Sequence, residues 1–137
     1  MLEAIMCLTM AIYYEARDQS PEGQIAVAQV VLNRVASDNF PNDVCSVVKQ
    51  GRYWSSIPMR HQCQFSFWCD GLKEEIRNKE AFGTAFIYAS ASYCGLLTDN
   101  TDGADHYHAS YVTPSWRNAG ELTAQIQDHI FYRLGNR

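Results

Sequence analysis

The sequence predicts a helix-rich α+β fold with a small antiparallel β-sheet. Apolar residues at helical spacing fill the first 36 positions, a second helical stretch ends near residue 94, and strand-like alternation begins only after residue 104. The 137 residues are 47% hydrophobic and 19% charged, which is typical of a folded globular chain. No repeat, linker or low-complexity tract divides the chain, so we expect a single domain over residues 1–137.

The first helix is predicted over residues 2–17, where apolar side chains dominate before a polar break at 18–21. Glu15 stands near its end, among apolar and aromatic neighbours. A carboxylate in such a setting is desolvated, and desolvation raises its pKa. An acid that stays protonated near neutral pH can donate a proton to a leaving group, which makes Glu15 a candidate catalytic acid. The alternative is that Glu15 pairs with Arg17 and serves only structure.

The second helix should have Ser20 as its N-cap and Pro21 in the first helical position, and should continue to about Ala36. Its apolar residues cover more than one face, so it is predicted to be the central helix of the core. We therefore expect polar partners inside the fold to hold Asn33 and Arg34.

The middle of the chain is less regular. A short helix is expected at about residues 42–50, and a longer one from residue 72 or 74 to Cys94. Between them, residues 51–71 follow neither helical nor strand periodicity. Long loops inside a compact domain are usually functional or disordered, and this one is too aromatic to be disordered.

The C-terminal part should contain the sheet. Residues 105–111 alternate and are predicted as a strand, which follows a polar turn at 98–103. A terminal hairpin is predicted with strands at 121–126 and 129–133 and a turn at Gln127-Asp128.

Charge and composition exclude several kinds of partner. The net charge is -4 and no Lys/Arg cluster is present, so nucleic acid is not expected as a partner. No segment approaches the ~18 consecutive apolar residues of a membrane span, so no membrane insertion is expected. The N-terminus also lacks the basic start and the small-residue cleavage site of a secretory signal.

The five cysteines are odd in number, so at least one is unpaired in a monomer. Cys7 and Cys94 lie in apolar helical stretches and are interpreted as buried free thiols. Among Cys45, Cys63 and Cys69, the sequence is equally compatible with a disulfide and with free thiols. The Cys63 to Cys69 spacing matches zinc sites poorly, so no metal is expected.

Four stretches, taken together, resemble a known family. They are residues 11–17, 22–35, 64–71 and 104–108, and the closing segment 128–133 is also similar. In this order and at these separations they resemble the catalytic domain of spore-cortex-lytic enzymes and related bacterial and phage cell-wall hydrolases. The resemblance covers nearly the whole chain.

The resemblance implies a lysozyme- or lytic-transglycosylase-like helical core that degrades peptidoglycan glycan strands, without a cofactor. Position by position, it makes Glu15 the single catalytic acid. It also implies two groups of substrate-binding residues on opposite sides of a groove, which are Gln64, Phe65 and Ser66 on one side and Tyr107 and His108 on the other. A monomer is expected.

The chain departs from the family pattern in two places. Residues 52–62 form a longer segment than usual, which could reshape the groove. Asp105 replaces a frequent threonine and adds a carboxylate. Each of the three tryptophans can be a core residue or a platform for a sugar ring: Trp54, Trp68 and Trp116.

Glycosidases usually employ two carboxylates, but here only Glu15 is marked as an acid. In a one-acid scheme, Glu15 protonates the glycosidic oxygen and then accepts a proton from the muramyl 6-hydroxyl, which attacks C1 and gives a 1,6-anhydro sugar. Arg17 would lower the pKa of the acid. Residues two apart point to different helix faces, so Arg17 is expected to point away from the groove.

The residues also leave alternatives open. His106 and His108 share one face of the predicted strand and Tyr107 the other, so one histidine is expected to be a structural hydrogen-bonding residue. The alternative activity is hydrolysis by an N-acetylmuramidase, and the alternative class is a non-catalytic glycan-binding module. A lysin made in a phage-infected cell, a virion-associated lysin or a trimmed domain of a secreted cell-wall enzyme would each fit this sequence.

Overall fold

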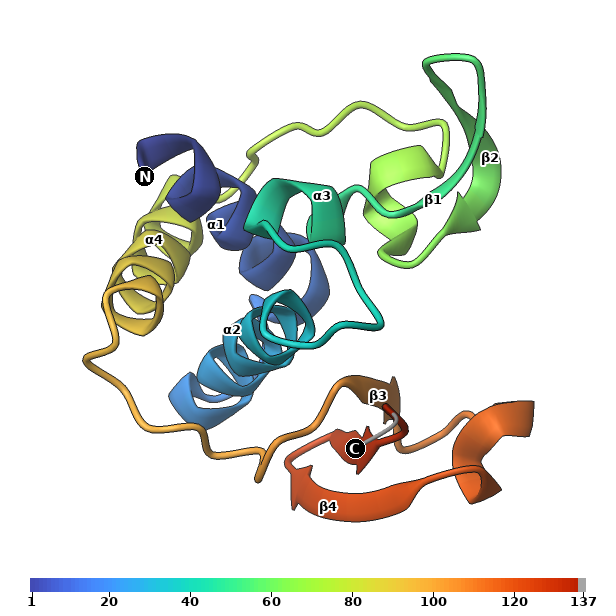
Figure 1. Ribbon diagram of the computed structural model, residues 1–137. Helices are drawn as coiled ribbons and strands as arrows, with labels where there is room; N and C mark the ends of the chain where they lie inside the picture. The colour runs from blue at the N-terminus through green and yellow to red at the C-terminus, as the bar shows by residue number, and fades with distance from the viewer. Residues whose placement is uncertain (136–137) are drawn as a thin grey trace.

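The computed structural model describes residues 1–135, which form a helical body flanked by two small antiparallel sheets (Figure 1). The helices are α1 (Leu2–Ala16), α2 (Pro21–Val35), α3 (Val44–Val48) and α4 (Lys79–Tyr93). The strands are β1 (Gly51–Trp54), β2 (Ile57–Cys63), β3 (His106–Ala109), β4 (Glu121–Ile126) and β5 (His129–Arg133), and the 3₁₀ turns are η1 (Ser66–Cys69) and η2 (Ser115–Asn118). The α+β prediction is confirmed. None of these helices is long and apolar enough to cross a membrane.

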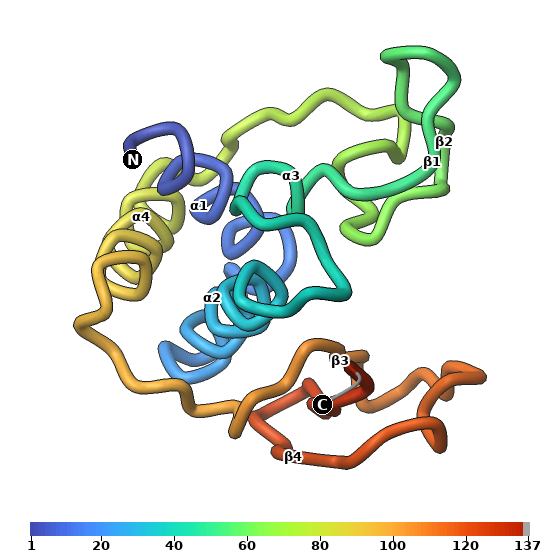
Figure 2. Tube along the Cα trace, viewed as in Figure 1, coloured from blue at the N-terminus to red at the C-terminus, as the bar shows by residue number. Residues whose placement is uncertain are grey.

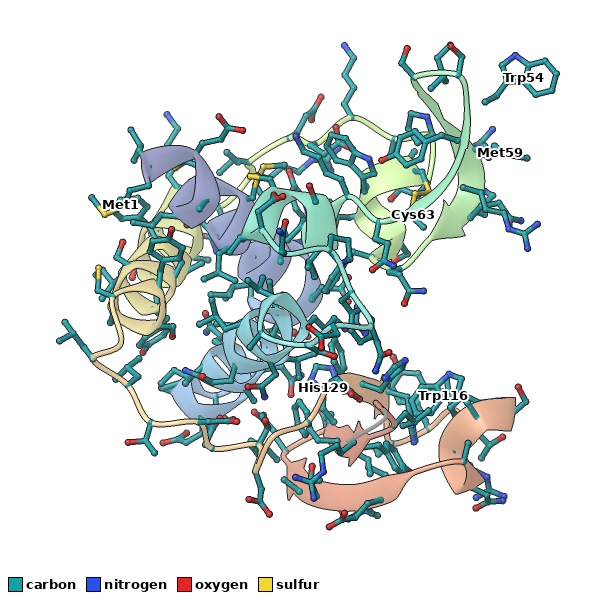
Figure 3. All side chains as sticks on the ribbon, viewed as in Figure 1. Met1, Trp54, Met59, Cys63, Trp116 and His129 are labelled. Atoms are coloured by element: carbon teal, nitrogen blue, oxygen red, sulfur yellow. A yellow bond between two sulfur atoms is a disulfide. The ribbon has the colours of Figure 1, made fainter. Side chains whose placement is uncertain are left out.

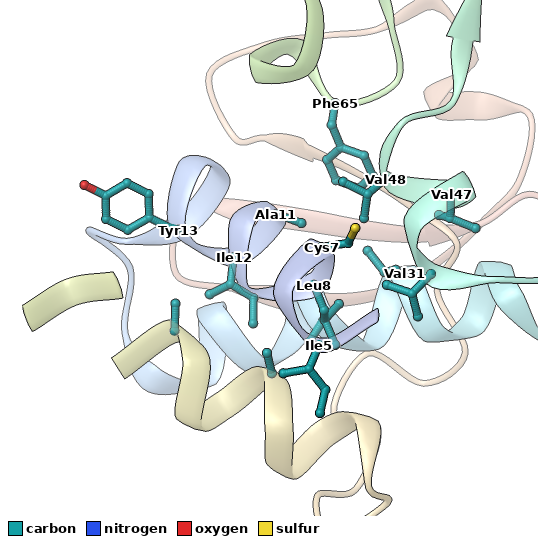
Figure 4. Close-up of a cluster of buried hydrophobic side chains, with 14 of the residues drawn as sticks. Ile5, Cys7, Leu8, Ala11, Ile12, Tyr13, Val31, Val47, Val48 and Phe65 are labelled. Atoms are coloured by element: carbon teal, nitrogen blue, oxygen red, sulfur yellow. The ribbon is translucent and has the colours of Figure 1, made fainter. Parts of the chain in front are cut away.

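Helix α1, rather than α2 as the sequence predicts, is the centre of the core, and it packs against α2, α3 and α4. Its side chains Leu8, Ile12 and Tyr13 are fully buried, and they meet Val31 of α2 and Val47 of α3 in one apolar cluster (Figure 4). Burying a large aliphatic side chain contributes roughly 1.5–3 kcal/mol, so this cluster dominates the stability of the body. It fixes the direction in which the C-terminal end of α1, and with it Glu15, leaves the core.

Helix α2 connects the helical body to the sheet. The Ser20 side chain accepts a hydrogen bond from the Gly23 N–H, and Pro21 occupies the first turn, as the sequence predicts. On its other face, Ala26 and Val30 pack against Ala104 and Phe131 in a second apolar cluster. This cluster docks the sheet onto the body.

The C-terminal sheet has the strand order β3-β5-β4, and both predicted hairpin strands are confirmed with their expected bounds. Its turn lies at residues 127–128, where Gln127 adopts a positive φ of 52°. The chain reaches this sheet through residues 94–105, which run from the end of α4 past α2 (Figure 2).

The prediction that α4 begins at residue 72 or 74 is wrong. Asn78 is its N-cap, with a side-chain oxygen that accepts from the Ala81 N–H. The Tyr13 hydroxyl accepts from the N–H groups of both Arg77 and Asn78, and the Tyr14 hydroxyl donates to the Glu75 carbonyl. Backbone groups engaged by α1 in this way are not free to form a helical turn, so residues 72–78 stay outside the helix.

The interpretation of residues 51–71 as an irregular loop is also wrong, because they contain the β1–β2 hairpin and η1. Nearly every residue of the two strands is exposed. Strand periodicity arises when one face is buried, so a hairpin exposed on both faces has no alternating pattern to detect.

The structure contains two disulfides, and one of them differs from the expectation for its cysteines. Cys7 is bonded to Cys45, which joins α1 to α3, so Cys7 is not the free thiol that its helical setting suggested. Cys63 is bonded to Cys69, one of the pairings left open, and this bond ties β2 to η1. Cys94 is the free cysteine of the described residues, but it is exposed rather than buried.

Candidate active site

Glu15 lies in the last turn of α1 and faces β3. The Tyr107 hydroxyl donates a hydrogen bond of 2.6 Å to Glu15 Oε1. Burial raises the pKa of Glu15, and the Tyr107 hydrogen bond and the positive charge of Arg34 offset only part of that increase. Burial and the neighbouring Glu15 also raise the pKa of Tyr107, which therefore stays a donor. A protonated Glu15 can accept from Tyr107 on Oε1 and present its own proton from Oε2.

Arg34 is a buried cation beside this acid. Only 5% of its surface is exposed, and Nε donates to the Asp105 carbonyl at 2.7 Å. The guanidinium lies 5.0 Å from the Phe40 ring centroid and 5.6 Å from that of Phe65. Its Nη1 has no hydrogen-bond partner among the described residues, and no carboxylate in that part of the chain forms an ion pair with it. The prediction that polar partners hold Arg34 is confirmed by the Asp105 contact.

Three adjoining cavities form a groove along Glu15. A cavity of about 210 Å³ is lined by Glu15, Arg34, Gln64, His106, Tyr107 and Trp116. A second one, of about 550 Å³, shares Glu15 and is also lined by Asp18, Tyr111, Asp128 and His129. A third, of about 400 Å³, shares Tyr14 and Arg17 with the second. Glu15 therefore lies where the two cavities nearest to it meet.

The groove has two sides. The hairpin side, residues 51–71, comprises β1, β2 and η1 and contributes Gln64 to the first cavity. The sheet side comprises β3, β4, β5 and η2 and contributes Tyr107 and Trp116 to it. Figure 3 shows Trp116 on the sheet side, below the hairpin that carries Trp54.

Of the five predicted substrate-binding residues, Gln64, Phe65 and Tyr107 line the Glu15 cavity, and Ser66 and His108 do not. Phe65 borders the cavity, yet it is only 2% exposed and packs in the core around α1. Ser66 is exposed at the start of η1 and is not among the residues lining the Glu15 cavity.

His108 points away from Glu15. It is buried, stacks on Tyr132 and lies within hydrogen-bond distance of the Tyr132 hydroxyl, at 2.9 Å, and of the Ala109 carbonyl, at 2.7 Å. Trp116 packs against the rings of both His106 and His108, so the two histidines share one side of β3, as their alternation predicts. His108 is thus the structural hydrogen-bonding residue of the pair, and His106 is the one that borders the cavity.

Asp105 stabilises the sheet side. Its carboxylate accepts from the N–H groups of Leu134 and Gly135, at 2.8 and 2.7 Å, and lies 2.9 Å from His106 Nδ1. Burial acts to raise its pKa, but these partners lower the pKa of Asp105 to about 2. Asp105, which stands where the family resemblance leads one to expect a threonine, therefore holds residues 134–135 against β3.

Arg17 does not point away from the groove, as its spacing from Glu15 suggested. It lines the second and third cavities, and its guanidinium lies 4.8 Å from the Tyr13 ring centroid. Arg17 is the C-cap of α1 and keeps helical backbone angles, so its long side chain reaches these cavities from a helix face other than that of Glu15. The cation that acts on the Glu15 pKa is Arg34, from a different helix.

Sequence reasoning missed several residues of the groove. Asp128 lies in the β4–β5 turn and shares the second cavity with Asp18 and Glu15. His129 follows it, and burial lowers its pKa. The resemblance of the closing segment 128–133 to the family was the signal for Asp128 and His129, but it assigned no role to either residue. Among residues 1–135, no group of three or more His, Cys, Asp or Glu side chains is arranged to hold a metal ion.

Comparisons with known proteins agree on one family. The model of the family described as Cell Wall Hydrolase matches residues 18–132, a range that begins just after Glu15. The spore cortex-lytic enzyme of Bacillus cereus is 42% identical over 53 residues, which are 39% of this chain and 20% of that protein. That of Bacillus subtilis is 50% identical over 44 residues, 32% of this chain and 14% of that protein. The matched part thus spans a fifth or less of these relatives.

Two solved structures are similar over almost the whole chain. The catalytic domain of the germination-specific lytic transglycosylase SleB from Bacillus anthracis is 29% identical, with a TM-score of 0.75 over 97% of this chain and 96% of that one. The catalytic domain of the Bacillus cereus SleB protein is 28% identical, with a TM-score of 0.70 over 97% and 91% of the two chains.

Proposed function

The chain belongs to the cell wall hydrolase family, and on that premise we propose that it is a peptidoglycan-degrading lytic transglycosylase with Glu15 as its general acid and base. The bond cleaved joins N-acetylmuramic acid to N-acetylglucosamine. The similarity to the SleB catalytic domains, one of them described as that of a lytic transglycosylase, supports this reaction class. In this proposal, residues 1–137 act as one monomeric catalytic domain.

The observation that carries the proposal is the hydrogen bond between Tyr107 and Glu15 in a half-buried site. A neutral donor holds the carboxyl in one orientation without adding a charge that would ionise it. Burial raises the pKa of Glu15, which favours the protonated form that a general acid requires.

In the proposed reaction Glu15 acts twice, first as a general acid and then as a general base. Glu15 gives its proton to the glycosidic oxygen, the bond from C1 of the muramyl residue to that oxygen breaks, and C1 develops oxocarbenium character. The Glu15 carboxylate then takes the proton of the muramyl 6-hydroxyl as its oxygen bonds to C1. The products are a free 4-hydroxyl and a 1,6-anhydro ring, no water is consumed, and Glu15 is protonated again.

Arg34 contributes most when Glu15 is ionised. The two charges attract each other only after Glu15 has released its proton, so the interaction is stronger in the transition state than in the ground state. Gln64 and His106 line the same cavity and supply hydrogen-bonding groups for sugar hydroxyl and acetamido groups.

One observation favours hydrolysis as a second candidate. Asp18 and Asp128 share the second cavity with Glu15, so either carboxylate could activate a water molecule there. The product would then be a reducing muramic acid end, as an N-acetylmuramidase gives. The Asp105 carboxylate, in contrast, accepts hydrogen bonds from the N–H groups of Leu134 and Gly135 and does not line this cavity.

The test of the acid is Glu15→Gln, assayed by release of soluble fragments from purified peptidoglycan. Gln keeps the acceptor for Tyr107 but has no proton to transfer, so we expect turnover to fall at least ~100-fold while binding persists. Glu22→Gln makes the same change at an exposed position of α2 and should retain activity. Retained turnover in Glu15→Gln would disprove the assignment. Binding by the wild type without any turnover would instead identify a glycan-binding module.

We also propose that the protein acts at the bacterial cell wall. A phage lysin, a virion-associated lysin and a trimmed domain of a secreted cell-wall enzyme all place such a domain against peptidoglycan. The spore cortex-lytic relatives are cell-wall enzymes by name, which supports action at the wall.

A further inference from the structure

The β1–β2 hairpin has an exposed apolar and basic face that the helical body does not cover. Trp54 pairs with Ile57, and strand alternation places Met59 on the same face as these two residues. Arg52 lies next to them along β1, in the bulge between Gly51 and Tyr53. Trp54 is 78% exposed and Ile57 66%, and Arg52 is exposed as well. We call these four residues the outer face. Figure 3 shows Trp54 and Met59 projecting away from the body of the molecule.

The opposite face of the hairpin is fixed to η1. Trp68 Nε1 donates to the Tyr53 hydroxyl at 2.9 Å, and Arg60 Nε donates to the Asp70 carbonyl at 3.3 Å. The Cys63–Cys69 disulfide closes the base. A two-stranded hairpin alone is marginally stable in water, so these contacts hold the outer face in a defined position.

The hairpin differs in charge from the rest of the chain. The hairpin segment, residues 51–63, contains Arg52 and Arg60 and no acidic residue, and the first carboxylate after it is Asp70. The net charge of the whole chain is -4, so the hairpin is a basic projection on an acidic protein. Such a surface is complementary in charge to an anionic partner.

The hairpin also continues the groove. Strand β2 ends at Cys63, and the next residue, Gln64, lines the cavity that contains Glu15. A polymer that leaves this cavity past Gln64 therefore meets the hairpin. This continuity favours the polymer bound in the groove, rather than an unrelated partner, as the ligand of the outer face.

We propose that the outer face is a second binding surface for peptidoglycan, outside the catalytic groove. Trp54 offers a flat aromatic surface to a sugar ring, and Arg52 offers a cation to the carboxylates of the stem peptides. The proposal rests on the proposed function in one respect, because it assumes that the polymer in the groove is peptidoglycan. It assigns a use to residues 52–62, the segment that is longer than the family pattern.

The test measures binding separately from turnover. In a Glu15→Gln background, co-sedimentation with purified sacculi should show binding at least about 10-fold weaker for Trp54→Ala with Arg52→Gln, which is typical of losing an aromatic and an arginine anchor. The matched control is Leu96→Ala with Lys79→Gln, because Leu96 is 77% exposed beyond α4 and Lys79 is exposed at the start of α4, away from the groove. This pair should bind as the background protein does.

A second measurement identifies the ligand. In the active protein, Trp54→Ala with Arg52→Gln should leave turnover of a short soluble glycan unchanged, because such a substrate fills only the groove, and should slow the digestion of sacculi. Unchanged sacculus binding would overturn the proposal. A loss seen only on phosphatidylglycerol vesicles would overturn it in favour of a membrane surface. A wild-type protein that binds sacculi through the outer face but releases no fragments would refute the proposed function and leave this surface standing.

Discussion

The two sides of the groove are built by opposite means. The sheet side has three strands, packs Phe131 and Ala104 against α2, and fixes its C-terminal segment through a buried carboxylate, Asp105. The hairpin side has two strands with both faces largely exposed. It is held to the body where Phe65 and Phe67 join the core cluster around α1, and the strands are tied to η1 by a disulfide and a few side-chain hydrogen bonds.

This difference matches what each side contributes to the site. Tyr107, which must hold Glu15 within hydrogen-bond distance, comes from the well-packed sheet. Gln64 and the outer face, which would contact a variable polymer, come from the exposed hairpin. A catalytic hydrogen bond requires a rigid support, whereas polymer contacts tolerate local movement.

The largest effect on stability is expected from Asp105→Asn on the sheet side. The amide keeps one acceptor oxygen, so the N–H of Leu134 or of Gly135 loses its partner in a buried site, at a cost of about 3 kcal/mol. Thermal unfolding would measure this loss. Asp38→Asn, at an exposed position, should change the free energy of unfolding little. Equal effects of the two substitutions would contradict the role given to Asp105.

The same carboxylate predicts an acid limit to stability. The pKa of Asp105 is about 2 in the folded protein, below its ordinary value of 3.8. A group whose folded pKa is lowered contributes stability above its unfolded pKa and loses it as the pH falls. Unfolding experiments between about pH 4 and pH 2 should therefore show a fall in stability that is smaller in Asp105→Asn.

A smaller effect is expected when the hairpin side loses its disulfide. The Cys63–Cys69 bond closes a short loop, with a sequence separation of 6, and loop-closure entropy assigns about 2 kcal/mol to it. Cys63→Ala with Cys69→Ala should therefore lower the free energy of unfolding by roughly that amount. It should also increase proteolysis within residues 51–71, while the sheet side stays protected. The measurement is limited proteolysis with mass analysis of the fragments. Equally increased cleavage on both sides of the groove would refute the claim that the disulfide stabilises the hairpin side alone.

The smallest of the three effects is expected from Tyr107→Phe. Loss of one hydrogen bond should lower kcat about 10-fold with little change in KM, because the acid is held less well while the groove is intact. The Tyr107 hydrogen bond lowers the pKa of Glu15, so its removal should move the alkaline limb of the pH–rate profile to higher pH. Tyr93→Phe, at an exposed position at the end of α4, provides a comparison for the pH profile. An alkaline limb that stays in place or moves to lower pH would contradict the role of Tyr107.

The two sides also differ in how far the sequence predicts them. Strands at 121–126 and 129–133 could be predicted because alternation survives where a sheet buries one face, as Phe131 does against α2. The hairpin at 51–63 could not, because its apolar and polar residues are exposed alike. The start of α4 was misplaced because two tyrosines of α1 engage residues 75–78, a contact between segments far apart in sequence.

For the site residues too, the sequence predicts what local patterns show and misses what depends on contacts between distant segments. Glu15 could be identified from its apolar setting, and Tyr107 from the family resemblance, but their contact depends on how α2 docks the sheet. Arg34 and Trp116 come from elements far apart in sequence, so no local spacing predicts that they share a cavity. His108 resembles a groove residue in sequence, yet strand alternation turns it toward Tyr132.

The most direct test of the account is mass analysis of the muropeptides that the wild-type protein releases from purified peptidoglycan. A single acid held by Tyr107 predicts products lighter by one molecule of water than the corresponding hydrolysed muropeptides, because the muramyl 6-hydroxyl closes a 1,6-anhydro ring. Reducing ends that carry a full molecule of water would contradict the one-acid mechanism. They would assign the attack to a water molecule activated by Asp18 or Asp128 in the neighbouring cavity.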